Sequence, residues 1–460
     1  MNLIPAPKKF NYINEKGIVI KPNIIFDKNF EKAVKSFCGY VKKSYKINFS
    51  FEEGGIELIY KPELDSDSYE IKSSKLYASS CEGANYALAT LYQLLEIKNG
   101  KVLLPEVEIS DKPECTHRTL MIDLARKFHP VEYLFYYVDM CWLYKVNRFQ
   151  LHLTDDQGFT FPSKAFPKLT CNGEFYSKDE LSRLAEYAND RGVVLIPELD
   201  IPGHCQKLQQ SHPEVFGTCG VLPACERVFT ALDKLYGEVC DVFPYSPYIH
   251  IGGDEAAVSR WQEDSETLEY MKEHNIADNE ELYTEFIRRV TEIIFDHKRT
   301  PIVWEGFHKS GNNKISKNVI VISWENFYQP VTDLAESGFT LINASWKPLY
   351  IVTPGTHWTP EEILNLSRFS WRHWWENSKA YPDGIDISTD NNVIGMQLCA
   401  WGDVLQTYKS GHKAASEEYE LVRERVPAMA EKNWNNSTVR NINDFNTAYA
   451  KINSLLNKKG

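Results

Sequence analysis

Short apolar runs alternate with helical patterns along the chain from residue 118 onward. Most of these runs are nearly continuous rather than alternating between apolar and polar positions, as expected for parallel strands whose two faces are both covered. They occur at 119–124, 148–153, 193–199, 248–251, 302–304, 319–324, 340–344 and 393–400. Eight successive βα units predict an α/β fold of the (β/α)8 TIM-barrel type.

Helices are predicted in the gaps between these strands. Ser177, with Glu180 three residues on, forms a capping box, and Gly192 ends the helix that follows. Asp278 and Glu281 open another helix in the same way. The buried sides of the two helices are assigned to Leu181, Leu184, Ala185 and Ala188, and to Leu282, Phe286, Ile293 and Ile294.

The first part of the chain has a different pattern. Short β-rich runs at 17–21, 55–60 and 69–72 alternate with helical stretches, the clearest at 84–95, which predicts a small α/β domain. The polar, proline-containing stretch 109–113 breaks the periodicity and is predicted to be a linker. The predicted units are an N-terminal α/β domain (1–112), the TIM barrel (113–412) and C-terminal helices packed on the barrel (413–460).

Composition narrows the choice of function. The formal net charge of −12 argues against a nucleic-acid binder and against a surface attracted to anionic membranes. The chain begins without a signal-peptide-like apolar stretch and has no apolar run of membrane-spanning length, so a cytoplasmic location is expected. The ten cysteines include no C-x-x-C pair, and neither a metal site nor a cofactor is expected.

Acidic side chains stand at the C-terminal ends of seven of the eight predicted strands, where a TIM barrel carries its chemistry. Clustered carboxylates raise one another's proton affinity and can keep a glutamic acid protonated for donation to a leaving oxygen. Tryptophans offer broad apolar faces for a pyranose ring, and nine of the eleven follow residue 300. The pattern favours acid/base catalysis on a sugar, although a tryptophan taken alone is more often a core residue.

Three motifs make this pattern specific. His152-Leu-Thr-Asp-Asp-Gln157, Pro197-Glu-Leu-Asp-Ile-Pro-Gly-His204 and His250-Ile-Gly-Gly-Asp-Glu255 together resemble family 20 of the glycoside hydrolases, over residues 118–403. The resemblance implies a retaining exo-β-N-acetylhexosaminidase. Its substrates would be oligosaccharides or glycoconjugates with a terminal β-linked GlcNAc or GalNAc residue.

The resemblance also implies roles for two adjacent acids. Glu255 would protonate the glycosidic oxygen and later deprotonate water. Asp254 would orient the substrate's acetamido group, whose oxygen attacks the anomeric carbon to give an oxazolinium intermediate. Such substrate-assisted catalysis is a recognised exception to the two-carboxylate scheme. The alternative role for the two acids is to cap the following helix.

Further positions are assigned to substrate binding by the same resemblance. Arg126 would hold the outer hydroxyls of the sugar, although a salt bridge to Asp123 is an alternative role. Asp155 and His204 would form a relay that adjoins Glu255 and adjusts its proton affinity. Structural support is expected from His152, Asp156 and Asp200.

Aromatic residues would enclose the terminal sugar. Tyr350 would hold the acetamido oxygen. Two positions depart from the family pattern, since Val352 stands where an acid is usual and Asp403 replaces a longer glutamate. Both family residues contact the far hydroxyls of the sugar, so the preference between gluco and galacto epimers stays open. The walls and floor of the site are assigned to Trp304, Trp324 and Trp401.

Residues 346–392 form an unusually long βα connection, with three tryptophans within 371–375. Loops of that length are usually functional or disordered, and the tryptophans argue against disorder. We expect the segment to cap the site on the leaving-group side. The alternatives are a subsidiary hydrophobic cluster or a homodimer contact.

Three other functions are weighed against this one. A glycosidase of the same family that releases a disaccharide would need a roomier pocket. The presence of Asp254 and Glu255 argues against a non-catalytic carbohydrate-binding barrel. A metal-dependent hydrolase would need paired histidines at strand ends, such as H-x-H on the first strand, and the sequence has none there.

Overall fold

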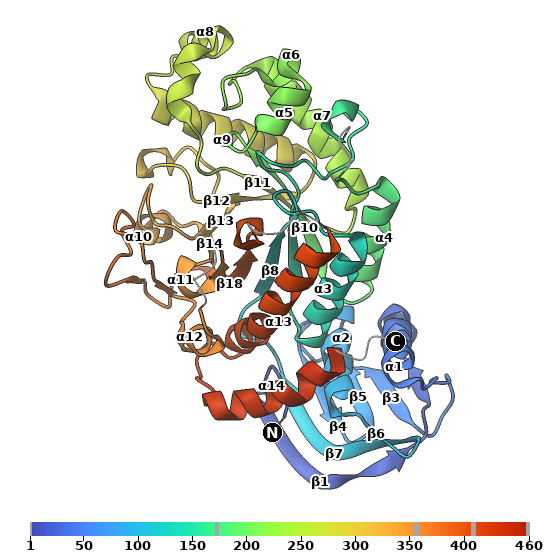
Figure 1. Cartoon of the computed structure of the whole chain (residues 1–460). Helices are drawn as coiled ribbons and strands as arrows, with labels where there is room; N and C mark the ends of the chain where they lie inside the picture. The colour runs from blue at the N-terminus through green and yellow to red at the C-terminus, as the bar shows by residue number, and fades with distance from the viewer. Residues whose placement is uncertain (1, 171–173, 353–357, 406–410, 457–460) are drawn as a thin grey trace.

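A closed barrel of parallel strands forms the centre of the molecule (Figure 1). The computed structural model describes residues 2–170, 174–352, 358–405 and 411–456. All eight predicted strands are confirmed, and the pairing of the seventh with the eighth closes the barrel. The strands are β8 (His117–Asp123), β9 (Arg148–His152), β10 (Val194–Ile201), β11 (Tyr248–Gly252), β12 (Thr300–Trp304), β13 (Ile320–Ser323), β14 (Thr340–Asn343) and β18 (Val393–Ala400).

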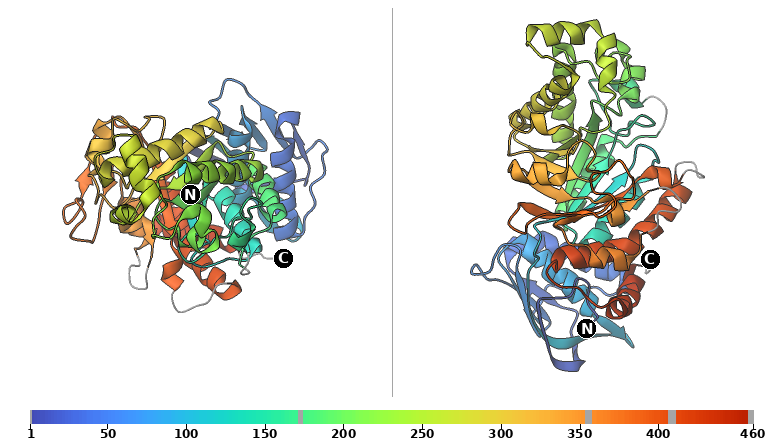
Figure 2. Two further views of the ribbon diagram at one scale, coloured as in Figure 1. Left: turned by 90° about the horizontal axis from the view of Figure 1, so that it is seen from above. Right: turned by 90° about the vertical axis from the view of Figure 1, so that its left-hand side faces the viewer.

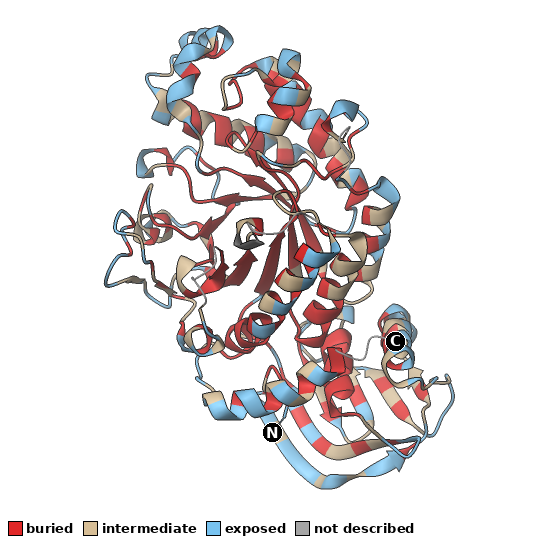
Figure 3. Cartoon of the chain, viewed as in Figure 1, coloured by how far each residue is buried: buried red, intermediate tan, exposed pale blue. Residues whose placement is uncertain are grey.

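Helices surround the barrel, so that its strands are buried while the outer helix faces are exposed (Figure 3). The predicted capping box is present, because Ser177 and Glu180 each accept a hydrogen bond from the other's backbone N–H. Asp278 accepts a hydrogen bond from the backbone N–H of Glu281 at the next predicted start. The helices include α3 (Val131–Leu143), α4 (Lys178–Asn189), α7 (Glu226–Val242), α9 (Asn279–Asp296) and α10 (Val331–Glu336).

The N-terminal part folds into a second sheet, which forms a layer at one end of the molecule (Figure 2). Helices α1 (Glu31–Tyr45) and α2 (Cys81–Leu94) pack with it, and the helix predicted at 84–95 corresponds to α2. The strand order is β1-β7-β4-β5-β3-β2, with β6 paired to β7. The strands are β1 (Lys9–Ile20), β2 (Ile24–Phe26), β3 (Ile56–Tyr60), β4 (Tyr69–Lys72), β5 (Lys75–Ala78), β6 (Glu96–Lys98) and β7 (Lys101–Asp111).

The predicted linker is wrong in its first half. β7 continues through Asp111, because Ile109 and Ser110 pair with both β1 and β4. Polar residues on one face of a strand break an apolar pattern without ending the strand, and here Ile109 is buried while Ser110 is exposed. The division of the chain at residues 112 and 412 stays a prediction.

The two sheets are joined through a buried polar cluster. Lys145, which follows α3, donates a hydrogen bond of 2.8 Å to the hydroxyl of Tyr69 and lies 3.6 Å from Asp111. Trp434 donates to the same aspartate, and its ring lies 4.6 Å from the Lys145 ammonium. Burial lowers the pKa of Lys145 to about 8. The Asp111 carboxylate and the Trp434 ring offset the cost of burying the Lys145 charge, because a buried charge needs a partner.

Two C-terminal helices follow the barrel. α13 (His412–Trp434) packs on β8, β18 and α3. α14 (Ile442–Leu456) instead lies beside the N-terminal part, where Lys451 faces Glu96 at 3.8 Å (Figure 1). No helix within the described ranges is long and apolar enough to cross a bilayer.

Candidate active site

A cavity of about 200 Å³ opens at the C-terminal ends of the barrel strands. Of the ten residues that the sequence assigns to the site, all but Asp155 and Trp304 line it. The lining also includes Asp200, Trp346 and Val352. Residues from six strand ends therefore converge on one small space, as the barrel geometry predicts. The predicted residues in the lining are Arg126, His204, Asp254, Glu255, Trp324, Tyr350, Trp401 and Asp403.

The adjacent acids Asp254 and Glu255 follow β11 but have different surroundings. Asp254 is 6% exposed, and one of its carboxylate oxygens has no hydrogen-bond partner among the described residues. The Glu255 side chain is 51% exposed, and its backbone adopts a φ of 46°. The turn before them needs glycine, because a Cβ at Gly252, where φ is 72°, would lie 1.7 Å from a carboxylate oxygen of Asp200. This turn sends one acid inward and the other outward.

A relay of charged groups leads to Glu255. The Nε2 of His204 lies 3.4 Å from Oε2 of Glu255, and its Nδ1 lies 3.3 Å from Oδ1 of Asp155. Asp155 also accepts from Arg126, whose Nη2 is 2.7 Å away. Although Asp155 does not line the cavity, the predicted contact of Asp155 and His204 with Glu255 is present. The role of this contact in catalysis stays a prediction.

Arg126 is fixed at the other side of the cavity. Asp123 accepts hydrogen bonds from the backbone N–H and from Nη1 of Arg126, both at 2.9 Å, so the alternative salt bridge is present as well. The guanidinium also lies over the Trp401 ring at 5.1 Å. Burial opposes the charge, but Asp123 and Asp155 outweigh it and raise the pKa of Arg126. A permanently charged, oriented donor beside Asp403 suits the binding of sugar hydroxyls.

A second, fully buried network lies beneath the cavity. Glu198 on β10 accepts a hydrogen bond from Nε1 of Trp304 at 2.7 Å, forms an ion pair with Nδ1 of His152 at 2.8 Å, and also faces His250. Nε2 of His152 lies 3.1 Å from Asp155, so this network continues into the relay. His152 therefore connects Glu198 to Asp155, which is consistent with the structural support expected of it.

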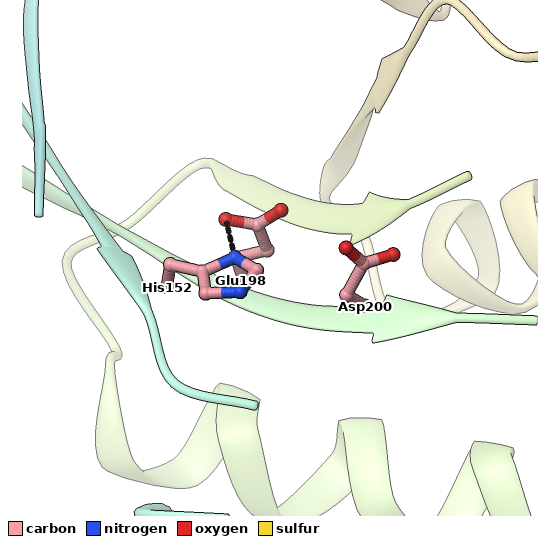
Figure 4. A group of neighbouring side chains, drawn as sticks. All are labelled: His152, Glu198 and Asp200. Atoms are coloured by element: carbon pink, nitrogen blue, oxygen red, sulfur yellow. Dashed lines mark ion pairs between the residues drawn. The ribbon is translucent and has the colours of Figure 1, made fainter. Parts of the chain in front are cut away.

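Groups of acids and histidines near this network place donor atoms within 4.8 Å of one another, as a metal ion would need. One group contains His152, Glu198 and Asp200. Figure 4 shows that the first two form an ion pair, while the Asp200 carboxylate stands apart, farther along β10. The Glu198 carboxylate also accepts hydrogen bonds from Trp304 and from Gln150.

The pKa values of the acid pair shift in opposite directions. Burial, followed by the charges of Asp200 and Glu255, raises the pKa of Asp254. The hydrogen-bonding contact with His204 lowers the pKa of Glu255, and burial opposes this only in part. Clustering was expected to hold the proton on Glu255, but in this structure the raised pKa belongs to Asp254. The sequence could not predict this, because exposure and the distance to His204 decide it.

Other acids around the cavity also favour the neutral form. Burial raises the pKa of Asp200 to about 7, although the charge of His204 opposes it. Burial raises the pKa of Glu325, which follows Trp324, to about 8, with Glu255 and Glu305 adding to it. Glu325 is 7% exposed; the sequence marks it as the acid at the end of the sixth strand but assigns it no role in the site.

Stacked aromatic rings form one wall of the cavity. Trp324 and Tyr350 are nearly parallel, with ring centroids 5.8 Å apart, and Trp346 stacks on both. Trp346 was missed as a site residue, although it follows the seventh strand much as Trp324 and Trp401 follow theirs. Trp304 does not form part of the wall. It lies beneath Trp401, at 5.9 Å, and is 1% exposed.

A family model and two related proteins all point to the same enzyme family. The model of the glycosyl hydrolase family 20 catalytic domain matches residues 115–437. The beta-hexosaminidase of Vibrio furnissii is 30% identical over 402 residues, 76% of this chain and 63% of that relative. The beta-hexosaminidase subunit beta of Entamoeba histolytica is 27% identical over 431 residues, 85% of this chain and 74% of that relative.

A solved structure has the same fold. The exo-β-N-acetylglucosaminidase of Vibrio harveyi, in complex with N-acetylglucosamine, superposes with a TM-score of 0.86 at 23% identity. The match covers 100% of this chain and 77% of that one. The N-terminal sheet and the barrel are thus both part of the shared architecture.

Proposed function

Because the chain belongs to glycosyl hydrolase family 20 and is a glycoside hydrolase of the β-N-acetylhexosaminidase type, we propose that it removes terminal β-linked N-acetylhexosamine by substrate-assisted catalysis. The observation that carries this proposal is the geometry of the acid pair. Asp254 is buried, and one of its carboxylate oxygens has no hydrogen-bond partner in the part of the chain that the structure describes; it lies next to the half-exposed Glu255 in a cavity of about 200 Å³.

In the first step, Asp254 accepts a hydrogen bond from the N–H of the substrate's acetamido group. The acetamido oxygen then attacks the anomeric carbon while the bond to the leaving oxygen breaks. Glu255 gives its proton to that oxygen, so the leaving group departs as a neutral alcohol. The product on the sugar is an oxazolinium ion, whose positive charge is stabilised by the Asp254 carboxylate.

In the second step, a water molecule attacks the anomeric carbon and opens the oxazolinium ring. Glu255, now ionised, takes a proton from this water and returns to its starting state. The anomeric configuration is retained after two inversions, because the acetamido oxygen and the water attack from opposite faces.

Substrate binding supplies the protonation states that the first step needs. A sugar in the cavity shields Glu255 from water, which disfavours its ionised form and raises its pKa. The acetamido N–H donates to Asp254, which favours the ionised form of Asp254. The single proton of the pair therefore moves from the buried acid toward the outer one when the substrate binds.

The size of the cavity supports release of a single sugar rather than a disaccharide. Pockets for drug-sized ligands are usually about 300–1,000 Å³, and this cavity is smaller. Trp346, Tyr350 and Trp324 close it on one side, and Arg126 and Asp403 close it on another. A second ring would have to lie outside this space.

The direct test is hydrolysis of aryl β-N-acetylglucosaminide and β-N-acetylgalactosaminide, with EDTA present, by the wild type and Glu255→Gln. We expect wild-type turnover and a loss of about 10²–10⁴-fold in the variant. An aryl β-glucoside, which lacks the acetamido group, should be inert. Turnover of the glucoside at a comparable rate would exclude substrate assistance, and no turnover of either amino sugar would exclude the proposed activity. The cytoplasmic location and a homodimer stay predictions.

A further inference from the structure

The turn that carries the acid pair, residues 252–255, has an unusual backbone. Three of its four residues adopt a positive φ, which is 72° at Gly252, 97° at Gly253 and 46° at Glu255. Glycine enters this left-handed region freely, but the Cβ of a glutamate makes it unfavourable. Such a conformation persists only where the surrounding structure holds it in place. The turn therefore needs supports from outside its own four residues.

Helix α9 supplies one of these supports. It lies beside β11 and β12 (Figure 1), and the hydroxyl of its Tyr283 donates a hydrogen bond to the carbonyl oxygen of Gly253. Ile287, one helical turn further on, packs on the same glycine, since a Cβ built at Gly253 would lie 3.2 Å from its Cδ1. Residues four apart share one face of a helix, so this face of α9 is applied directly to the turn. Tyr283 is 4% exposed and is not among the residues that the sequence assigned to the buried side of this helix.

Other segments enclose the same turn. A Cβ at Gly306, which follows β12, would lie 1.9 Å from the carbonyl oxygen of Gly253 and 2.8 Å from the Cα of Asp254. A glycine at this position lets the two backbones touch. At the end of the turn, the Tyr328 hydroxyl contacts the backbone N–H of Glu255. The acid pair is thus held by α9 and by the segments that follow β12 and β13.

The hydroxyl of Tyr283 acts on the peptide that precedes Asp254. Without it, the buried carbonyl oxygen of Gly253 would lose a donor, and an unsatisfied buried carbonyl favours any rotation that restores a partner. Rotation of this peptide moves both acids relative to the cavity, and a misplacement of about 1 Å can cost about 10²-fold in rate. Tyr283 itself does not line the cavity. Any effect of Tyr283 on the reaction must therefore pass through the turn.

We propose that Tyr283 is a positioning residue for the reaction, because its hydrogen bond to Gly253 fixes the turn that directs Asp254 inward and Glu255 outward. This inference rests on the proposed function, since the turn matters for the rate only if the two acids act as described. The alternative is a role confined to stability. Loss of a positioning residue lowers the rate of the chemical step in the folded enzyme, whereas loss of a purely stabilising residue lowers Tm and leaves kcat unchanged.

The test is Tyr283→Phe, which removes the hydroxyl and keeps the ring. With the aryl β-N-acetylglucosaminide, we expect kcat to fall at least roughly ten-fold. The Kd of N-acetylglucosamine, measured by calorimetry, should change less than about three-fold, because Arg126 and Asp403 bind the sugar from β8 and β18 rather than from this turn.

The matched control is Tyr187→Phe. The hydroxyl of Tyr187 donates to Asp139 at 2.6 Å, a hydrogen bond that joins α4 to α3 on the outside of the barrel. Its loss removes the same chemical group from a site without contact to the turn. We expect this variant to lower Tm and to keep the wild-type kcat.

The outcomes separate this inference from the proposed function. If the wild type does not cleave the glycoside, the proposed function fails, and this inference fails with it. If the wild type is active and folded Tyr283→Phe has the same kcat, the activity stands and the positioning role is wrong. A Kd that rises as much as kcat falls would also overturn this role, because the hydroxyl would then support the whole cavity.

Thermal unfolding shows whether each variant is folded under the assay conditions. If Tyr283→Phe does not fold, Ile287→Val decides, because it removes the Cδ1 that packs on the same glycine. We expect Ile287→Val to lower kcat by a smaller factor than Tyr283→Phe, with the Kd of N-acetylglucosamine unchanged. An unchanged kcat in that variant would overturn the proposal.

Discussion

The Nε2 of His204 lies 3.4 Å from Oε2 of Glu255, while the Nδ1 of the same ring lies 3.3 Å from Asp155. Burial opposes a charge on His204, but the charge of Asp200 and the contacts with Asp155 and Glu255 raise its pKa well above the usual value. A raised pKa favours the cationic form of His204 next to Glu255, the proposed catalytic acid. We therefore expect His204 to influence the pH at which the free enzyme loses activity.

Replacing His204 should move the acidic limb of the pH profile. In the proposed mechanism the active pair of Asp254 and Glu255 holds one proton, and a second proton on Glu255 would inactivate it. The His204 cation lowers the pKa of Glu255 and keeps this second proton off. In His204→Asn, the acidic limb of kcat/KM should therefore move to higher pH by about one unit. Asparagine also tolerates the positive φ of 44° at this position.

The pH profile distinguishes this role from a structural one. A residue that only supported the fold would lower kcat/KM at every pH without moving the limb. Gln210→Asn, a polar substitution at an exposed position of the neighbouring helix α5 (Gln206–Ser211), serves as the control. An unmoved limb in His204→Asn would show that His204 does not set the protonation of Glu255.

Asp254→Asn should lower kcat more than it raises KM. The amide can still contact the acetamido group, but it cannot balance the positive charge of the intermediate. Loss of one stabilising group of this kind costs about 10²–10³-fold in kcat. Steady-state kinetics on the aryl N-acetylglucosaminide measure this split. A loss confined to KM would mean that Asp254 binds the ground state and the transition state equally.

Arg126→Lys should weaken substrate binding even though the charge is kept. The guanidinium spans Asp123 and Asp155, and lysine cannot reproduce that two-sided geometry. Hydrogen bonds to a charged group are worth about 1.5–3 kcal/mol, so kcat/KM should fall roughly 10- to 100-fold. The inhibition constant of N-acetylglucosamine should rise in parallel. An unchanged inhibition constant would place Arg126 outside the binding site.

Glu325→Gln should flatten the pH dependence of stability. Burial, with Glu255 and Glu305, raises the pKa of Glu325 to about 8 in the folded protein, against 4.5 for the ordinary group. Between these values the unfolded chain loses the proton while the folded chain keeps it, so this contribution to stability falls as pH rises. The wild type should therefore lose more Tm between pH 5 and pH 8 than the variant.

The expected difference in Tm is about 2 °C. Glu336→Gln is the matched control, because Glu336 is an exposed glutamate at the end of α10, eleven residues after Glu325 in the chain. That substitution should leave the pH dependence of Tm as it is in the wild type. Equal slopes for the wild type and Glu325→Gln would show that Glu325 ionises normally in the folded protein.

The barrel and the acid pair could be predicted from the sequence because their signals are local. A strand buried on both faces is apolar throughout, so β8 to β14 and β18 stand out one at a time. Motifs such as His250-Ile-Gly-Gly-Asp-Glu255 join a strand to its catalytic end within six residues. The pattern failed in the N-terminal sheet, for example where polar residues occupy one face of a strand at the end of β7.

Only the tertiary structure decided which residues share the cavity and which acid of the pair has the raised pKa. Trp346 lies in the wall and Trp304 lies beneath Trp401, although both stand at the C-terminal ends of barrel strands. The raised pKa belongs to Asp254 rather than to Glu255, because one is buried and the other contacts His204. Packing and desolvation depend on distances between residues far apart in the chain, and no local pattern in the sequence records those distances.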